Sequence, residues 1–206
     1  MKENAAGIRK TIVNNYHLPD AEVSFFDGLF SEAHANHLFE QLIGTTIWQQ
    51  DTITIYGKKH LVPRLTAWYG DADKPYTYSG IKMNPEPWTI TLNEIKQKVE
   101  AEAATKFTNV LLNYYRNGQD SMGWHRDNEK ELGENPIIAS VSFGQTRPFH
   151  LRHKFRKDVP KLTIPLTHGS LLIMKGTTQH FWEHQVPKSA KTLEPRINLT
   201  FRKIIV

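Results

Sequence analysis

The stretch from residue 113 to residue 129, NYYRNGQDSMGWHRDNE, carries a histidine and an aspartate that could serve metal chemistry. His125 and Asp127 are separated by one residue, so on a strand both side chains would point to the same face. An imidazole beside a carboxylate supplies two ligands of the 2-His-1-carboxylate triad, which holds non-haem iron(II) and leaves positions open for oxygen and a co-substrate. Because such a pair is also common in solvated loops, the rest of the chain has to supply further ligands.

A third ligand is expected downstream, on a different strand that faces the same cavity. Five histidines are candidates: His150, His153, His168, His180 and His184. His150 and His153 lie in a cationic stretch that would repel a metal ion, and His168 precedes a glycine in a predicted turn. His180 and His184 lie four residues apart on one predicted strand, QHFWEHQV, and would share a face. The spacing does not choose between them.

Two arginines near the end of the chain could hold an acidic co-substrate. Arg196 and Arg202 lie six residues apart in RINLTFR and project to the same face of a predicted strand. A planar guanidinium can grip a carboxylate through two hydrogen bonds. Asn113 and Tyr115, two residues apart, could add hydrogen bonds from the opposite sheet. Two arginines on one strand are usually a solvated edge, but these alternate with apolar residues, which favours a binding role.

The composition limits the possible metal donors and the compartment. The chain has 206 residues, enough for one domain with a sizeable core, and no cysteine, so a metal can be held only by histidine and carboxylate side chains. No run approaches the ~20 apolar residues of a membrane span, and the N-terminus lacks the apolar region of a secretory signal. We therefore expect an intracellular protein, cytoplasmic in a bacterium or nuclear in a eukaryote, and a monomer. The formal charge of +5 permits nucleic acid as a partner without requiring it.

The first half of the chain predicts helices that pack against a sheet. Residues 1–20 are polar and irregular, and we expect a flexible arm there. Residues 21–30 indicate a short strand and a turn. Ser31 is typical of a helix N-cap, and the apolar positions that follow predict a helix ending near Gly44. A second amphipathic helix is predicted from about Thr89 to Ala104.

From Val110 onward the pattern is all β. The predicted strands are residues 110–115, 137–143, 149–153, 162–166, 170–174, 181–186 and 197–205. Short strands at this spacing are typical of a jelly roll of two packed sheets. The predicted fold class is therefore α+β, a jelly roll carrying N-terminal helices, with residues 21–206 forming a single domain.

Three surface features could serve a nucleic acid. Residues 51–62 predict a hairpin with Tyr56 near its tip, beside Lys58 and Lys59; a buried tyrosine and one that stacks on a base are equally compatible with this pattern. Tyr76 and Tyr78 lie on one side of an extended segment and could line a slot for a flat ring. Residues 147–161 form a basic stretch with six cations and one acid, Asp158. The cations are Arg147, Arg152, Lys154, Arg156, Lys157 and Lys161, to which Lys188 and Lys191 could add.

Several motifs together resemble one family. The segments YGKKHLVPRLTAWYGD, YTYSG, LLNYYRNGQDSMGWHRDNE, PIIASVSFG, LTHGSLLIMKG and EPRINLTFRK are similar to the AlkB family of iron(II)/2-oxoglutarate-dependent nucleic-acid dioxygenases, most of all to its duplex-DNA-repairing homologues. The resemblance implies the double-stranded β-helix (jelly roll) fold. It also implies a nucleotide-recognition region at residues 51–105, which includes the hairpin, and a jelly-roll core at residues 106–206.

The resemblance also assigns roles to individual residues. It implies that iron(II) is held by His125, Asp127 and His184. It implies that 2-oxoglutarate is held by Asn113, Tyr115, Arg196, Asn198, Thr200 and Arg202. It implies that the substrate is contacted by Tyr56, Arg64, Tyr76, Tyr78, Ser79 and Glu129, with Tyr56 as the finger that fills the gap in the stacked bases. Trp124 departs from the family pattern and has no assigned role.

The implied activity is oxidative demethylation of N-alkylated bases in DNA, duplex or single-stranded. Iron(II), O₂ and 2-oxoglutarate would convert the N-methyl group of N1-methyladenine or N3-methylcytosine to formaldehyde, with release of succinate and CO₂. Two alternatives stay open: an RNA or protein demethylase or hydroxylase with the same cofactors, and a non-catalytic nucleic-acid-binding module. A jelly roll with chance histidines is disfavoured by the number of matching motifs.

Overall fold

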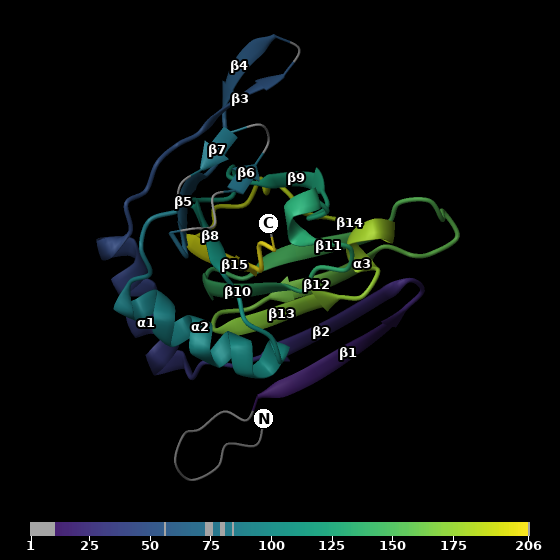
Figure 1. The fold of residues 1–206 in the computed structure, drawn as a ribbon, viewed down its shortest axis with the longest axis horizontal. Helices are drawn as coiled ribbons and strands as arrows, with labels where there is room; N and C mark the ends of the chain where they lie inside the picture. The colour runs from purple at the N-terminus through teal and green to yellow at the C-terminus, as the bar shows by residue number, and fades with distance from the viewer. Residues whose placement is uncertain (1–10, 56, 73–75, 79–80, 84, 206) are drawn as a thin grey trace.

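A seven-stranded antiparallel sheet forms the middle of the protein (Figure 1). The computed structural model describes residues 11–55, 57–72, 76–78, 81–83 and 85–205. The strands of this sheet lie in the order β1 (Ile12–Leu18), β2 (Ala21–Asp27), β13 (Ser170–Lys175), β10 (Ile138–Gly144), β15 (Arg196–Arg202), β8 (Asn109–Tyr115) and β5 (Leu65–Gly70). The strands therefore come from both ends of the chain, and β15 lies in the interior of the sheet.

A second, four-stranded sheet faces the first. Its order is β12 (Leu162–Leu166), β11 (Arg147–His153), β14 (Trp182–Val186) and β9 (Met122–His125). An apolar core that includes Phe149, Leu151, Leu172 and Trp182 fills the space between the two sheets. The two facing antiparallel sheets confirm the predicted jelly roll.

Two helices cover the other face of the large sheet (Figure 1). They are α1 (Glu32–Thr45) and α2 (Ile90–Ala103). Thr89 caps α2, because its side chain accepts a hydrogen bond from the backbone N–H of Leu92 at 3.1 Å. Ser31 precedes α1 as predicted, although its side chain makes no capping hydrogen bond. Both helices bury apolar side chains against the sheet, which confirms the α+β class.

The remaining elements are short. Two hairpins, β3 (Thr52–Ile55) with β4 (Lys58–Leu61) and β6 (Tyr76–Tyr78) with β7 (Ile81–Met83), project above the sheets (Figure 1). A 3₁₀ turn, η1 (Lys130–Leu132), follows β9, and a one-turn helix, α3 (Thr178–Phe181), precedes β14. No helix among the described residues is long and apolar enough to cross a membrane.

The N-terminal segment differs from the expectation of a flexible arm. Ile12–Leu18 form β1, which pairs with β2 over seven residue pairs as the outermost strand of the large sheet. Polar side chains in this segment predict an irregular arm, but an outermost strand buries few of its side chains and so tolerates them. Residues 1–10 lie outside the described part of the chain.

Side chains along β15 alternate between the two faces of the large sheet. Ile197, Leu199 and Phe201 are buried in the core beneath the helices, so Arg196 and Arg202 face the opposite sheet. Gly144, at the end of the adjacent β10, has φ +87°, and a Cβ there would clash with the backbone oxygen of Pro195. Glycine thus permits the close approach of the segment that leads into Arg196.

Candidate metal and co-substrate site

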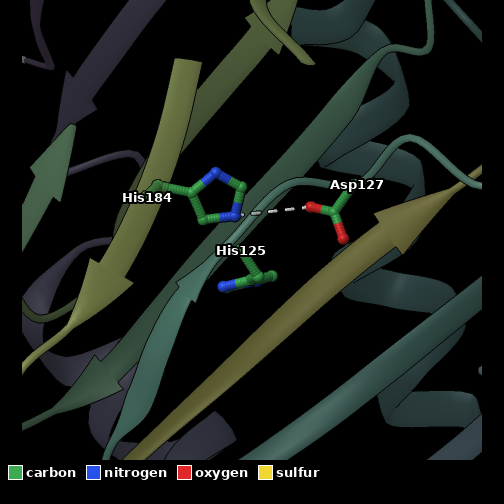
Figure 2. A group of neighbouring side chains, drawn as sticks. All are labelled: His125, Asp127 and His184. Atoms are coloured by element: carbon green, nitrogen blue, oxygen red, sulfur yellow. Dashed lines mark ion pairs between the residues drawn. The ribbon is translucent and has the colours of Figure 1, made fainter. Parts of the chain in front are cut away.

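Three side chains of the metal-ligand type converge between the two sheets (Figure 2). His125 and His184 are cross-strand partners on β9 and β14, with ring centroids 4.2 Å apart. His184 Nε2 lies 3.6 Å from Asp127 Oδ2. One potential ligand atom from each of the three residues lies within 4.8 Å of the others. This arrangement matches the facial triad of two histidines and one carboxylate.

Asp127 reaches the cluster in a different way from the one predicted. The strand β9 ends at His125, so the period of a strand does not place Asp127. Instead, its backbone N–H donates to Gln179 Oε1 at 3.0 Å, and its Oδ1 accepts from Arg202 Nη2 at 2.6 Å. The sequence gives no sign of the role of Gln179, because no local pattern records a contact across 52 residues.

The charges of the cluster are those that metal binding requires. Burial lowers the pKa of His125. Burial, with His125 close by, lowers the pKa of His184 to about 3. Burial alone would raise the pKa of Asp127, but Arg202 and the two histidines outweigh it and hold that pKa below its usual range. At neutral pH the site therefore offers two neutral imidazoles and one carboxylate, the protonation states in which these groups bind metals.

The other candidate histidines lie elsewhere. His180 belongs to α3, not to the strand of His184, and its Nε2 hydrogen-bonds the backbone oxygen of Glu134. His168 Nδ1 accepts from the backbone N–H of Gly144 at 2.7 Å. His150 lies beside Gln185, and His153 accepts two backbone hydrogen bonds from the loop that follows it. The prediction that His180 and His184 share a strand is therefore wrong.

A cavity opens beside the cluster, and all six predicted co-substrate residues line it: Asn113, Tyr115, Arg196, Asn198, Thr200 and Arg202. Arg196 is fully buried, and its Nη2 donates to Ser142 Oγ at 2.9 Å. Its Nε and Nη1 are buried and have no hydrogen-bond partner among the described residues. Burial lowers the pKa of Arg196 to about 10, so the group stays cationic at neutral pH. A buried cation with two unused donors fits a carboxylate ligand.

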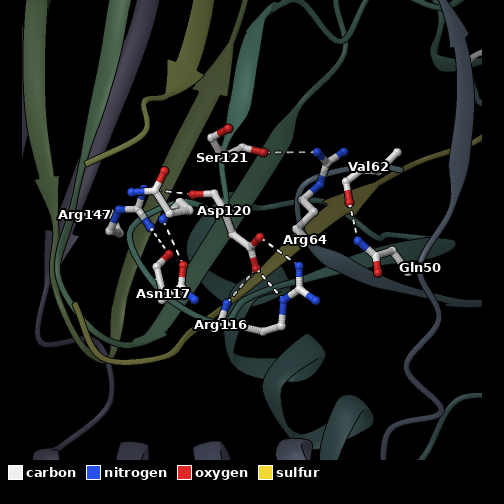
Figure 3. A network of polar contacts seen from close by, with 9 residues as sticks. Gln50, Val62, Arg64, Arg116, Asn117, Asp120, Ser121 and Arg147 are labelled. Atoms are coloured by element: carbon white, nitrogen blue, oxygen red, sulfur yellow. Dashed lines mark hydrogen bonds and ion pairs between the residues drawn. The ribbon is translucent and has the colours of Figure 1, made fainter. Parts of the chain in front are cut away.

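Arg64 lies behind the cavity wall rather than in it. Its Nε donates to Asn113 Oδ1 at 2.6 Å and its Nη1 to the backbone oxygen of Ser121 at 3.2 Å, the second of which is drawn in Figure 3. A guanidinium only donates, so it fixes the carbonyl end of Asn113 toward itself and leaves the amide N–H groups of Asn113 for the cavity. The resemblance places Arg64 at the substrate, whereas its contacts support the co-substrate wall.

Asn198 and Thr200 are held by the neighbouring strand. Asn198 Nδ2 donates to Ser140 Oγ at 2.7 Å and to the backbone oxygen of Val141 at 2.9 Å, while its Oδ1 accepts from Thr200 at 3.0 Å. These contacts make both residues a rigid part of the cavity wall.

Arg147 was predicted to belong to an exposed basic stretch, and this prediction is wrong for Arg147. Only 1% of its surface is accessible. Its guanidinium donates to the backbone oxygens of Asn117 and Asp120 at 3.2 and 3.0 Å (Figure 3). It also donates to the backbone oxygen of Pro187 at 2.6 Å. It therefore organises the turn that joins β8 to β9. The alternation of Arg147 with the inward residues of β11 was a signal that could have revealed its burial.

The predicted substrate residues are described only in part. Tyr76 and Tyr78 lie on β6, while Tyr56 and Ser79 lie outside the described residues. Glu129 precedes η1, and its Oε2 is buried without a hydrogen-bond partner among the described residues. The other predicted cations of the surface, Lys58, Lys59, Lys188 and Lys191, are exposed.

Trp124 lies on the side of β9 opposite the cavity. The Arg152 guanidinium carbon lies 4.1 Å from its ring centroid, and Arg152 also donates to Glu183 Oε2 at 2.9 and 2.7 Å. Trp124 and Glu183 immediately precede His125 and His184, respectively. The contact therefore links the two histidine-bearing strands from the outside, which gives Trp124 a structural explanation.

We expect Arg152→Ala to lower the free energy of unfolding by about 1 kcal/mol, because it removes a cation–π contact and a partly exposed ion pair. Thermal or urea unfolding measures this change. Arg156→Ala is the matched control, because Arg156 forms an ion pair with exposed Asp158 and its loss should change stability much less than the loss of Arg152. Equal effects of the two substitutions would contradict the role given to Arg152.

Comparisons with known proteins find relatives that match most of this chain. The profile of the 2OG-Fe(II) oxygenase superfamily matches residues 22–202. The alpha-ketoglutarate-dependent dioxygenase alkB homolog 3 of Homo sapiens is 43% identical over 192 residues, which cover 89% of this chain and 66% of that protein. The DNA oxidative demethylase ALKBH2 of Homo sapiens is 41% identical over 187 residues, covering 86% of this chain and 72% of that protein.

The chain thus spans 66% of the length of the first of these relatives. The solved structure of OsALKBH1 superposes with a TM-score of 0.66 over 92% of this chain and 100% of that chain, at 16% identity. That likeness concerns the fold.

Proposed function

Because this chain belongs to the 2OG-Fe(II) oxygenase superfamily and, within it, to the AlkB family, we propose that it is an oxidative demethylase of N-methylated bases in DNA. The proposed substrates are N1-methyladenine and N3-methylcytosine. The observation that carries the proposal is the His125–Asp127–His184 cluster beside a buried arginine with two unused donors. A metal triad alone would suit many reactions. The adjoining site, which can bind a carboxylate, favours 2-oxoglutarate as the co-substrate.

Iron(II), O₂ and 2-oxoglutarate would supply the oxidising power, converting the N-methyl group to formaldehyde with release of succinate and CO₂. His125, Asp127 and His184 would hold the metal, and Arg196 would hold a carboxylate of 2-oxoglutarate through its Nε and Nη1. The amide N–H groups of Asn113, oriented by Arg64, would donate to the same ligand. Tyr115, Asn198, Thr200 and Arg202 complete the wall.

The chain keeps its ligands ready for the metal. Arg202 holds the Asp127 carboxylate ionised and oriented, and Gln179 fixes the backbone of Asp127. Such contacts around a ligand set its geometry and its affinity for the metal. The buried apolar residues Leu111, Phe149 and Leu166 line the same cavity and exclude water from it.

For the substrate, we propose that Glu129 offsets the positive charge of the methylated base. The free Oε2 of Glu129 could offset the positive charge of N1-methyladenine or N3-methylcytosine, or accept a hydrogen bond from it. A base in a duplex would first be extruded, at a cost of a few kcal/mol that is smaller when the methyl group has already broken the base pair. Tyr76, Tyr78 and Ser79 remain proposed pocket residues, and Tyr56 the proposed wedge.

The target could instead be RNA or a protein side chain with the same cofactors. The identities of 43% and 41% to alkB homolog 3 and ALKBH2 do not separate these targets, and only the second relative is named for DNA. A non-catalytic binding module is disfavoured by the unused donors of buried Arg196, since such a group costs free energy unless a ligand satisfies it.

The purified protein with iron(II), 2-oxoglutarate and O₂ is expected to release formaldehyde and succinate in equal amounts from oligonucleotides that carry N1-methyladenine. Matched single-stranded DNA, duplex DNA and RNA oligonucleotides of one sequence would rank the targets by rate. Unmethylated oligonucleotides and added chelator are the controls. Metal-loaded protein that releases no formaldehyde from any oligonucleotide would end the demethylase proposal, and faster release from RNA would move the target to RNA.

A further inference from the structure

Phe155 exposes a large aromatic side chain in a cationic loop. The loop of residues 154–161 joins β11 to β12, and 63% of the surface of Phe155 is accessible. Lys154, Arg156 and Lys157 surround it in the sequence, and Lys154 Nζ lies 5.2 Å from the ring centroid of Phe155. Arg156 is paired with Asp158, whereas Lys154 and Lys157 form no ion pair with another described residue and carry the available positive charge beside Phe155. An exposed aromatic ring among cations suits a polyanion that carries flat rings.

The loop holds Phe155 in a defined position. His153 Nδ1 accepts from the backbone N–H groups of Phe155 and Arg156 at 3.2 and 3.0 Å. The backbone N–H of Lys154 donates to the oxygen of Phe181 at 2.7 Å. The ring of Phe155 meets the ring of Phe181 edge-on, with centroids 6.2 Å apart. One side of Phe155 therefore packs on the protein, and its exposed part is presented without a further ordering cost.

The helix α3 connects this loop to the metal-ligand segment. Gln179 binds the backbone of Asp127, and Arg126 Nη1 donates to the backbone oxygen of His180 at 3.0 Å. The next residue, Phe181, contacts Phe155. Figure 1 shows the loop between β11 and β12 projecting beyond α3. Phe155 is therefore joined through α3 to the segment that carries Asp127, and a flanking strand that crosses α3 would meet its exposed ring.

We propose that Phe155 is a stacking platform for an unpaired nucleobase of the strand that flanks the target base, with Lys154 and Lys157 contacting its phosphates. This proposal rests on the proposed function, because it assumes that a nucleic acid is the substrate. Phenylalanine has no hydrogen-bonding group, so the platform would not select a base. The contact would hold the flanking strand and would not take part in the reaction.

The test compares binding of a long and a short strand. Fluorescence anisotropy would measure the Kd of an unmethylated, labelled twelve-nucleotide single strand and of a trinucleotide. Phe155→Ala removes the aromatic ring on which a base would stack. It should therefore raise the Kd of the long strand by about fivefold to a hundredfold and leave the Kd of the trinucleotide unchanged. Phe155→Trp should restore tight binding, and Phe155→Leu, which is apolar but has no ring, should not.

Each outcome either supports or overturns the proposal that Phe155 is a stacking platform. An unchanged Kd of the long strand in Phe155→Ala, an equal loss for both lengths, or full binding by Phe155→Leu would overturn it. Formaldehyde release by the wild type from a methylated trinucleotide separates the two proposals, because it tests the demethylase without reaching Phe155. If the protein releases formaldehyde but binds long strands equally well with and without the Phe155 ring, the platform proposal is wrong and the proposed demethylase activity stands.

Discussion

Asp127→Ala is expected to abolish turnover and to weaken iron(II) binding by at least about 100-fold. Asp127 supplies the carboxylate of the cluster, and losing a ligand should exceed the 10–100-fold cost of losing a partner of a ligand. The substitution also removes the carboxylate that binds buried Arg202, so the free energy of unfolding should fall by about 3 kcal/mol. Metal titration, formaldehyde release and thermal unfolding measure the three effects.

Two control variants separate the effect on metal binding from the effect on stability. Asp127→Asn keeps the size of the side chain but loses its charge, and should also lose turnover. Asp158→Ala removes an exposed carboxylate outside the cluster and should keep both iron binding and turnover. Full activity of folded Asp127→Asn would remove Asp127 from the ligand set.

Arg196→Ala is expected to raise the 2-oxoglutarate concentration needed for half-maximal rate by about 100-fold or more. Its unused Nε and Nη1 would make two charge-assisted hydrogen bonds to the co-substrate, each contributing about 1.5–3 kcal/mol. Iron binding should change little, because Arg196 donates to Ser142, which lies outside the metal cluster. Turnover as a function of 2-oxoglutarate concentration, with metal binding measured separately, checks both statements.

Arg196→Lys is the matched variant. It keeps the positive charge but not the planar pair of donors, so its 2-oxoglutarate requirement should lie between those of the wild type and Arg196→Ala. Arg202→Ala should differ from both, because Arg202 binds Asp127 and its loss should weaken iron binding as well. An unchanged 2-oxoglutarate requirement in Arg196→Ala would show that Arg196 holds something else.

The repeating pattern of the strands made the scaffold predictable. The predicted bounds of residues 162–166 coincide with β12, and the alternation along β15 correctly placed Arg196 and Arg202 on one face. The helix predicted from about Thr89 to Ala104 agrees with α2, because its apolar residues recur at helical spacing. These features depend on interactions close in the sequence, which a pattern records.

The parts that depend on distant contacts were not predictable in this way. Spacing left His180 and His184 open because both were assigned to one strand, whereas α3 ends at Phe181 and only His184 lies on β14. Asp127 lies beyond the end of β9 and is held by Gln179 and Arg202, far away in the sequence. Such contacts form only when the two sheets pack together.

The most direct test of the account is the position of the metal in a crystal of the wild-type protein grown anaerobically with iron(II) and 2-oxoglutarate. Anomalous scattering at the iron edge is expected to show one strong peak within coordination distance of His125, Asp127 and His184, with a carboxylate of 2-oxoglutarate bound to Arg196. A strongest peak away from these three side chains, or one that His184 does not reach, would contradict the account.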